Sequence, residues 1–166
     1  MLCQVFLLDP FEELSLLIKA VYRESQRQLT EAFHDLGITP AQAEVLLVLY
    51  QAEPMSLGAL GDYLIAEGGH PSRLVDRLVQ SGDVERRSAI DDRRRLELLL
   101  TEQGRVRSQQ VMAVKQKMLA AAKPLMAQHD IAPMKQLLED YLQKSRRAKT
   151  VEMRRQLAQQ LPQPPA

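Results

Sequence analysis

The feature that most constrains this sequence is the way proline and glycine divide residues 38–101 into short segments. Three of these segments repeat apolar residues at helical spacing. Two later segments have the length of strands and flank a charged connection. We therefore expect three short helices followed by a hairpin, with the helices over residues 40–51, 57–65 and 71–81 and the strands over residues 84–87 and 96–100.

Local signals mark the ends of these short helices. Thr39 is a candidate N-cap, with Pro40 at the first helical position and Gln42 at the capping-box position. Ser56 is a candidate N-cap for the second helix, and Gly82 ends the third. In this order two helices can brace a third while the hairpin projects beside it, which predicts a winged helix-turn-helix.

Longer helical patterns flank this segment. Residues 11–36 carry an apolar stripe that is interrupted by Ser25 and Gln28. Either the helix bends there, or a polar notch faces a partner or a ligand. Residues 102–128 form a second long pattern, in which Pro124 indicates a bend or a break.

The composition agrees with a largely helical chain. Hydrophobic residues make up 45% of it and aromatic residues only 4%, a balance that favours helices with little sheet. A last helix is expected from about Asp130, with a tail over residues 159–166. The predicted fold class is mainly α with a two-stranded β-wing. A winged helix-turn-helix region over residues 38–101 lies between long helices over residues 11–36 and 102–158, all in one domain of 166 residues.

This geometry suits duplex DNA. An α-helix fits the major groove, and a thin, positively charged hairpin can follow the backbone or enter the minor groove. The helix over residues 71–81 has His70, Ser72 and Arg73 at its N-terminal end, which enters a groove first and favours a phosphate. Arg73 is the candidate base reader because its planar fork matches O6 and N7 of guanine, and Arg77 is less buried on the same helix.

Three arginines lie at or just past the tip of the predicted wing, namely Arg93, Arg94 and Arg95. Strand alternation points Arg94 away from its two neighbours, so one face can contact DNA while carboxylates hold the other. Asp92 lies two residues before Arg94 and is a candidate to fix it, or another nearby arginine, by a charge-assisted bond. Asp91 shapes the turn.

Charge alone does not separate DNA binding from a solvated or protein-binding surface. The chain has a net charge of only +1, and residues 70–95 hold seven bases against five acids. The alternative function is a winged-helix protein-interaction module without specific DNA binding. Residues 144–155 hold six bases and one acid, and form either a solvated terminal helix or an arm that contacts phosphates.

The sequence has no catalytic or metal-binding pattern. The three histidines are far apart and lack paired carboxylates, and no phosphate-cradling glycine loop is present. The single cysteine, Cys3, cannot form an internal disulfide. We expect no enzyme activity, no metal and no cofactor. No apolar run is long enough to span a bilayer and the N-terminus lacks a signal peptide, so we expect a cytoplasmic protein without a membrane partner.

Five short motifs, taken together in this order and spacing, resemble the MarR family of regulators. They are ITPAQAEVL over residues 38–46, SRLVDRL over residues 72–78, VERR over residues 84–87, DRR over residues 92–94 and LTEQG over residues 100–104. The resemblance implies a homodimer whose interface is built by the N- and C-terminal helices. It also implies that the helix over residues 71–81 enters the major groove, that Arg94 reaches the minor groove, and that Asp92 is the aspartate of the family's Asp-x-Arg pair.

The resemblance further implies a repressor that binds a pseudo-palindromic operator in double-stranded DNA. Such regulators release DNA when a small, often aromatic, effector or an oxidant acts between the DNA-binding and dimerisation regions. Tyr22, Ser25 and Gln28 are the residues expected near such a cleft. Cys3 lies upstream of the position where peroxide-sensing relatives place their reactive thiol, so no redox switch is predicted.

Overall fold

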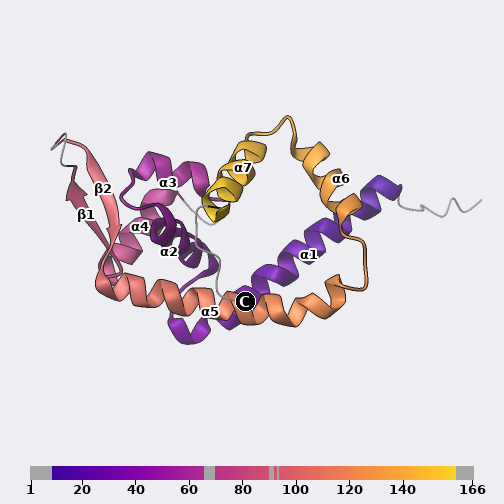
Figure 1. The fold of residues 1–166 in the computed structure, drawn as a ribbon, viewed down its shortest axis with the longest axis horizontal. Helices are drawn as coiled ribbons and strands as arrows, with labels where there is room; N and C mark the ends of the chain where they lie inside the picture. Colours follow the sequence, from indigo (N-terminus) through magenta and orange to yellow (C-terminus); the bar gives the residue numbers. More distant parts are fainter. Residues whose placement is uncertain (1–8, 66–69, 90–91, 93, 160–166) are drawn as a thin grey trace, which may run out of the picture. The chain divides into compact units, whose positions relative to one another are not determined.

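The chain forms helices and one two-stranded antiparallel sheet (Figure 1). The computed structural model describes residues 9–65, 70–89, 92 and 94–159. It divides into two compact units, Met1–Pro40 and Ala41–Ala166. The fold class predicted from the sequence, mainly α with a two-stranded wing, is confirmed.

The first unit is a long helix followed by a single helical turn. Helix α1 spans Pro10–Ala32, and Asp9 and Glu12 form a capping box at its start. The 3₁₀ helix η1 spans His34–Leu36 and ends at Gly37, whose φ of 65° is left-handed. The glycine therefore ends the helical segment where the sequence predicts a stop.

The structure shortens the helix that was predicted over residues 11–36. The α-helix stops at Ala32 because Phe33 has φ −95° and ψ 0°, which begins the tighter turn of η1. Helix α1 is continuous across Ser25 and Gln28. Six large apolar side chains of α1 are exposed, namely Phe11, Leu16, Leu17, Ile18, Val21 and Tyr22.

The second unit is built on three short helices that share a core. Helix α2 spans Pro40–Ala52, α3 spans Leu57–Tyr63 and α4 spans Pro71–Gln80. The Ser56 hydroxyl caps α3 by accepting the Ala59 amide at 3.2 Å, as predicted. All three helices contribute fully buried side chains, namely Val45, Leu46, Val48, Leu49, Leu60, Val75 and Leu78.

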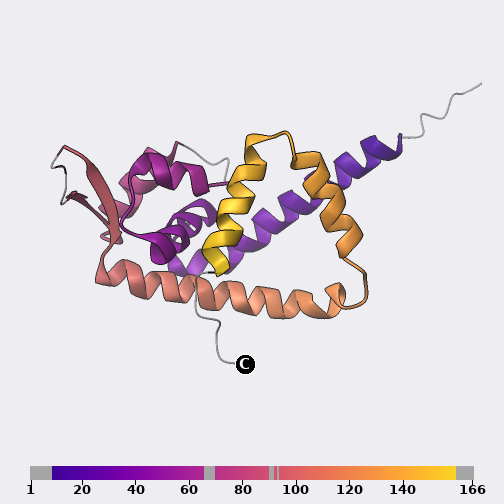
Figure 2. The same cartoon turned by 45° about the horizontal axis from the view of Figure 1, so that its top comes forward.

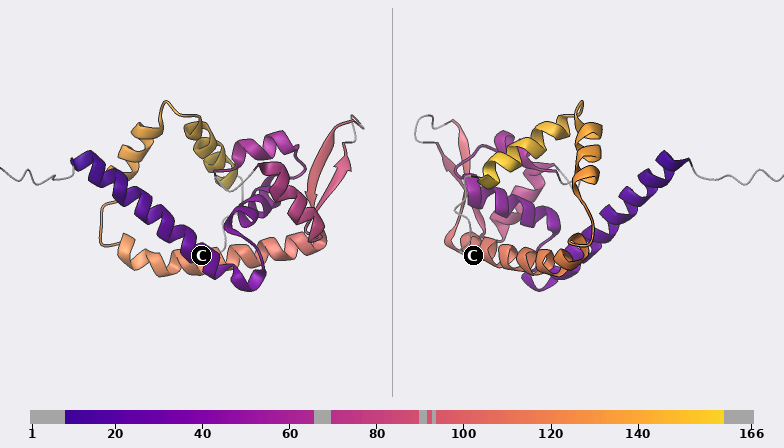
Figure 3. Two further views of the ribbon diagram at one scale, coloured as in Figure 1. Left: turned by 180° about the vertical axis from the view of Figure 1, so that it is seen from behind. Right: turned by 45° about the vertical axis from the view of Figure 1, so that its right-hand side comes forward.

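The hairpin follows these helices and forms the wing (Figure 3). Strand β1 spans Val84–Ser88 and β2 spans Leu96–Leu100, with Val84 opposite Leu100 in the antiparallel register. Met55, just before α3, forms an isolated bridge with Leu98 of β2, and its amide and carbonyl both bond to that residue. Strand β2 is therefore bonded to the segment just before α3 as well as to β1.

Three helices complete the second unit. Helix α5 spans Glu102–Met126, α6 spans Ala132–Leu142 and α7 spans Arg146–Gln159. The last predicted helix is thus two helices, because Ser145 closes a turn on Leu142 and its hydroxyl accepts the Arg147 amide at 3.2 Å. Helix α5 continues through Pro124, where the sequence predicts a bend or a break, and ends at Met126.

Within the second unit, helix α7 packs beside α3 (Figure 2). Its buried side chains are Thr150 and Leu157. The Arg147 guanidinium donates to the carbonyl of Leu64 at 3.1 Å, at the C-terminal end of α3. From Arg146 onward, the basic stretch over residues 144–155 therefore belongs to a helix with one packed face, and not to a fully solvated one.

Candidate nucleic-acid interface

Helix α4 divides its side chains between the core and the solvent. Leu74, Val75 and Leu78 are buried, whereas Arg73 and Arg77 are exposed. Helical spacing produces this division, because residues three and four apart lie on the same face. The exposed face therefore carries two guanidinium groups at the surface.

The N-terminal end of α4 is not capped by the side chain of its own N-cap residue. His70 is the N-cap residue, but its side chain makes no capping hydrogen bond, and Pro71 occupies the first turn. Ser72 is half-buried next to it. The first turn of a helix leaves backbone N–H groups without intrahelical partners, and its dipole favours an anion. The three predicted residues at this end, His70, Ser72 and Arg73, thus lie together around the start of one helix.

An ion pair joins α4 to the wing. The Arg86 guanidinium of β1 lies 2.6 Å from the Asp76 carboxylate of α4. Both side chains are partly exposed. The sequence alone does not reveal this pair, because its members are ten residues apart on different elements. The pair orients the wing relative to the exposed face of α4.

Other acids near the wing also form ion pairs with neighbouring arginines. Arg87 lies 2.5 Å from Glu85 on the same strand, and Arg95 lies 3.4 Å from Glu97. In contrast, the guanidinium groups of Arg73, Arg77 and Arg94 have no ion-pair or hydrogen-bond partner in the described part of the chain. All three of these arginines are predicted DNA contacts.

Asp92 acts on the backbone of the wing loop. Its carboxylate accepts the backbone amide of Arg94 at 2.9 Å, and its carbonyl accepts the amide of Arg95 at 2.9 Å. Its contact with Arg94 is therefore an Asx turn on the backbone, because a carboxylate two residues earlier is well placed to close such a turn. A charge-assisted bond from Asp92 to another nearby arginine stays a prediction. Arg93 and Asp91 lie outside the described residues.

A buried aspartate holds the root of the wing. Asp83 has 0% exposure, accepts the Ser81 hydroxyl at 2.6 Å and accepts the Gln103 amide at 3.1 Å. The guanidinium of Arg107 on α5 lies 3.2 Å from the same carboxylate. These bonds join the end of α4, the start of β1 and the start of α5. This role was not predicted, although an aspartate directly after Gly82 and before a strand was a usable signal.

The predicted effector residues lie in the first unit, on α1. Tyr22, Ser25 and Gln28 are all at least partly exposed, and the Gln28 amide donates to the Glu24 carboxylate at 2.9 Å. Hydrogen bonds from Arg27 and then Gln28 lower the pKa of Glu24 to about 2. The polar interruption of the apolar stripe is therefore a charged, hydrogen-bonded surface on a continuous helix.

Neither a metal cluster nor a membrane span is found among the described residues. No group of three or more potential metal ligands is close enough to hold an ion within the part of the chain that the structure describes. Among these same residues, no helix has both the length and the apolar character that are needed to cross a bilayer.

Comparisons with known proteins agree with this geometry. Residues 38–96 match the MarR family. The chain is 25% identical over 108 residues to the HTH-type transcriptional repressor MdtR of Bacillus subtilis, which covers 65% of this chain and 70% of that relative. It is 29% identical over 92 residues to the organic hydroperoxide resistance transcriptional regulator of the same organism, which covers 55% of this chain and 63% of that relative.

Solved structures extend the match beyond the winged region. A mutant of MarR from E. coli in complex with operator DNA is 31% identical, with a TM-score of 0.68 over 81% of this chain and 99% of that one. Reduced AbfR bound to DNA is 24% identical, with a TM-score of 0.62 over 79% of this chain and 88% of that one, and shares the fold.

The fold and the exposed basic face of α4 beside a charged wing define a DNA-binding winged helix-turn-helix protein. The chain belongs to the MarR family of transcriptional regulators.

Proposed function

We propose that the protein is a cytoplasmic homodimeric repressor that binds a pseudo-palindromic operator in double-stranded DNA and is released by a small effector. One observation carries the DNA-binding part of this proposal. The guanidinium groups of Arg73, Arg77 and Arg94 have no partner among the described residues, while neighbouring arginines are paired with acids. Unpaired guanidinium groups are available to phosphates and to guanine edges.

Helix α4 supplies the base-reading contacts in this proposal. His70, Ser72 and Arg73 surround its N-terminal end, where the helix enters the major groove, and Arg73 bonds to a base edge. Arg77 lies one turn further along the exposed face and contacts a phosphate.

The wing supplies the second set of contacts. Arg94 enters the minor groove beside the half-site, together with Arg93, and the Asx turn of Asp92 sets the direction of the loop. This role needs the wing to be held in place beside α4, which the ion pair of Arg86 with Asp76 supports.

A homodimer accounts for the apolar surface outside the winged region. On α6, Met134 is 65% exposed and Tyr141 is 73% exposed, and such side chains are unusual on a free surface when several lie on one helix. The apolar side chains of α1 are exposed in the same way. We assign both helices to the dimer interface, so that two copies of α4 read two half-sites.

An effector acts on this dimer in the proposal. Tyr22 offers an aromatic ring, and Ser25 and Gln28 offer hydrogen-bonding groups along one helix. This combination suits a small aromatic molecule with polar substituents.

Selection of bound duplexes from a random pool tests the proposal. The expected result is a site with two-fold symmetry and half-sites about one helical turn apart. In binding assays across a salt series, Arg94→Ala should weaken binding about tenfold or more and lower the slope of affinity against salt by about one. Arg87→Ala is the matched control, because Arg87 is already paired with Glu85. Absence of any selected site, together with capture of a protein partner, would instead support a winged-helix interaction module.

A further inference from the structure

The outer edge of strand β2 is covered by the short segment that follows α2. The amide and the carbonyl of Leu98 both bond to Met55, and the amide of Leu100 donates to the carboxylate of Glu53. Residues two apart on a strand direct their backbone groups to the same side, so these bonds all lie on the edge of β2 that faces away from β1. The Glu53 carboxylate therefore occupies the place that a carbonyl of a third strand would have.

Glu53 is held in this place by an ion pair. Its side chain is 11% exposed, and its second carboxylate oxygen pairs with the guanidinium of Arg105 on α5. Arg105 lies at the start of that helix, where its amide donates to the carbonyl of the N-cap residue Thr101 at 2.9 Å. A buried carboxylate needs hydrogen bonds and a counter-charge, and here β2 supplies the donor while α5 supplies the charge. Glu53 therefore connects β2 to α5.

The same helix holds the other strand of the wing. The guanidinium of Arg107 lies 3.2 Å from the carboxylate of Asp83, the buried residue directly before β1. Arg105 and Arg107 are two residues apart, a spacing at which side chains do not share a helix face. One guanidinium therefore reaches Glu53 and the edge of β2, while the other reaches the start of β1. The first turns of α5 thus hold the roots of both strands.

The bond between the wing and α4 is more exposed than these two. The side chains of Arg86 and Asp76 are 36% and 49% exposed, whereas those of Glu53 and Asp83 are 11% and 0% exposed. Water screens an exposed ion pair, so it contributes little to holding two elements together. The direction of the wing is therefore fixed more firmly by α5 than by α4.

We propose that Glu53 is a positioning residue for the DNA contact of the wing. Its carboxylate, held by Arg105, keeps β2 at a fixed angle to α5 and so directs Arg94, which lies six residues before Leu100, towards the minor groove. Glu53 acts through the wing and not on DNA, because the negative charge of DNA disfavours a direct contact with a carboxylate. The inference rests on the proposed function, in which Arg94 makes the minor-groove contact.

Glu53→Gln separates this role from simple electrostatics. Glutamine keeps an oxygen that can accept the Leu100 amide, but it loses the charge that holds Arg105. The substitution removes a negative charge, so electrostatics alone predicts tighter binding to DNA. We expect the opposite in gel-shift assays on the selected operator, an affinity about three- to tenfold lower, because Arg94 is no longer directed at the groove. An affinity equal to or above that of the wild-type protein would overturn the proposal.

A double-mutant cycle shows whether Glu53 acts through the wing. Glu53→Gln should weaken operator binding much less in an Arg94→Ala background, because the contact that it directs is already absent. Its effect should multiply with that of Arg73→Ala, since Arg73 lies on α4 and not on the wing. Effects that multiply in both backgrounds would indicate a general loss of structure and would refute a role in positioning Arg94.

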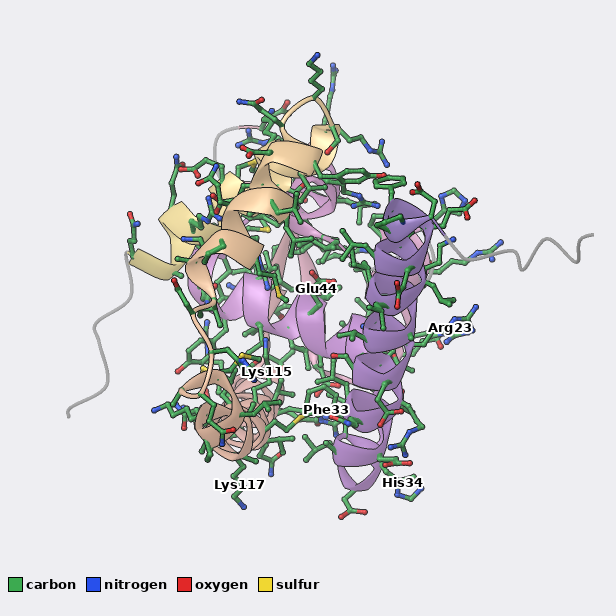
Figure 4. The ribbon with its side chains drawn as sticks, turned by 90° about the vertical axis from the view of Figure 1, so that its right-hand side faces the viewer. Arg23, Phe33, His34, Glu44, Lys115 and Lys117 are labelled. Carbon is green, nitrogen blue, oxygen red and sulfur yellow. The ribbon has the colours of Figure 1, made fainter. Side chains whose placement is uncertain are left out.

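Arg105 provides the second half of the test. Arg105→Met should weaken operator binding in the same way, whereas Arg105→Lys should retain most of the affinity because it keeps a positive charge beside Glu53. Lys117→Met is the matched control for the loss of one positive charge from α5, because Lys117 is exposed and points away from Glu44 of α2 (Figure 4). Equal losses in Arg105→Met and Lys117→Met would contradict the proposal.

The folding of each variant is checked by circular dichroism. If Glu53→Gln does not fold, Arg105→Met carries the test, because the side chain of Arg105 is 43% exposed and its removal leaves Glu53 bonded to β2. The double-mutant cycle with Arg94→Ala is then measured in that background, with the same expectation.

Hydrogen exchange of the free protein allows the two proposals to fail separately. The amides of β1 and β2 should exchange faster in Glu53→Gln than in the wild-type protein, and at the wild-type rate in Lys117→Met. Faster exchange without any specific DNA binding by the wild-type protein refutes the proposed function and leaves the hold of Glu53 on the wing. Specific DNA binding by the wild-type protein, with exchange and affinity unchanged in Glu53→Gln, refutes the positioning role and leaves the proposed function.

Discussion

Gly104→Ala tests how tightly the root of the wing is packed. A Cβ atom on Gly104 would lie 2.9 Å from the carbonyl carbon of Asp83 and closer still to its carbonyl oxygen. Carbon atoms in ordinary contact are about 3.5–4.0 Å apart, so the start of α5 and the backbone of Asp83 must separate. That carbonyl also accepts the Thr101 amide at 3.0 Å, and this bond would lengthen or break.

The loss of stability expected for Gly104→Ala can be worked out from these contacts. Overpacking of a rigid backbone contact costs about 1–3 kcal/mol, and a lost hydrogen bond costs about 1 kcal/mol. Alanine recovers up to about 1 kcal/mol through its helix propensity. With that recovery, the net expectation is a loss of about 1–3 kcal/mol in the free energy of unfolding, or a melting temperature about 2–12 °C lower.

Thermal and urea unfolding followed by circular dichroism measure this loss. Gly58→Ala on α3 is the matched control, because the nearest atom to its added Cβ would be the Ser56 hydroxyl oxygen at 3.9 Å. Gly58→Ala should therefore leave stability unchanged or raise it by up to about 1 kcal/mol. Gly104→Ala with wild-type stability would refute the reasoning, since the close approach of Asp83 leaves no room for the methyl group.

Three further predictions concern charged groups. Asp76→Asn should change stability by no more than about 1 kcal/mol, because its pair with Arg86 is exposed, and should weaken operator binding in gel-shift assays because this pair orients the wing beside α4. Asp83→Ala should cost about 2–4 kcal/mol in urea unfolding, because it removes a buried carboxylate that accepts from Ser81 and Gln103 and that pairs with the Arg107 guanidinium. Lys115→Met should raise stability at neutral pH, because burial lowers the pKa of Lys115 and folding therefore penalises its charged form. This advantage should disappear as the pH rises from the folded pKa towards 10.5, and an advantage that grows over that range would contradict it.

Much of the winged region could be predicted from the sequence because its signals are local. Ser56 caps α3, Gly37 and Gly82 adopt positive φ at the ends of helical segments, and apolar spacing identifies the buried face of α4. Each of these features depends on a few neighbouring residues, so the helix order and the hairpin follow without knowledge of the tertiary contacts.

The features that could not be predicted are those that depend on distant residues. The pair of Arg86 with Asp76 needs α4 and β1 to be packed before its members meet. The burial of Leu157 needs α7 to pack against other parts of the second unit. The basic composition of residues 144–155 favoured a solvated helix, because composition does not show that Arg147 has a carbonyl partner at the end of a different helix.

The small surplus of positive charge in the winged region does not show which of its arginines are available to DNA. Asp76 and Glu85 are occupied by Arg86 and Arg87, and Asp83 is buried against Arg107. These acids lower the net charge of the winged region, but each of them is held in an ion pair that stabilises the wing or its root. The arginines left without partners among the described residues are then a small set with fixed positions, at α4 and at the wing loop. Because a paired guanidinium must first lose its carboxylate to bind a phosphate, the pattern of pairing, and not the net charge, decides which arginines can contact DNA.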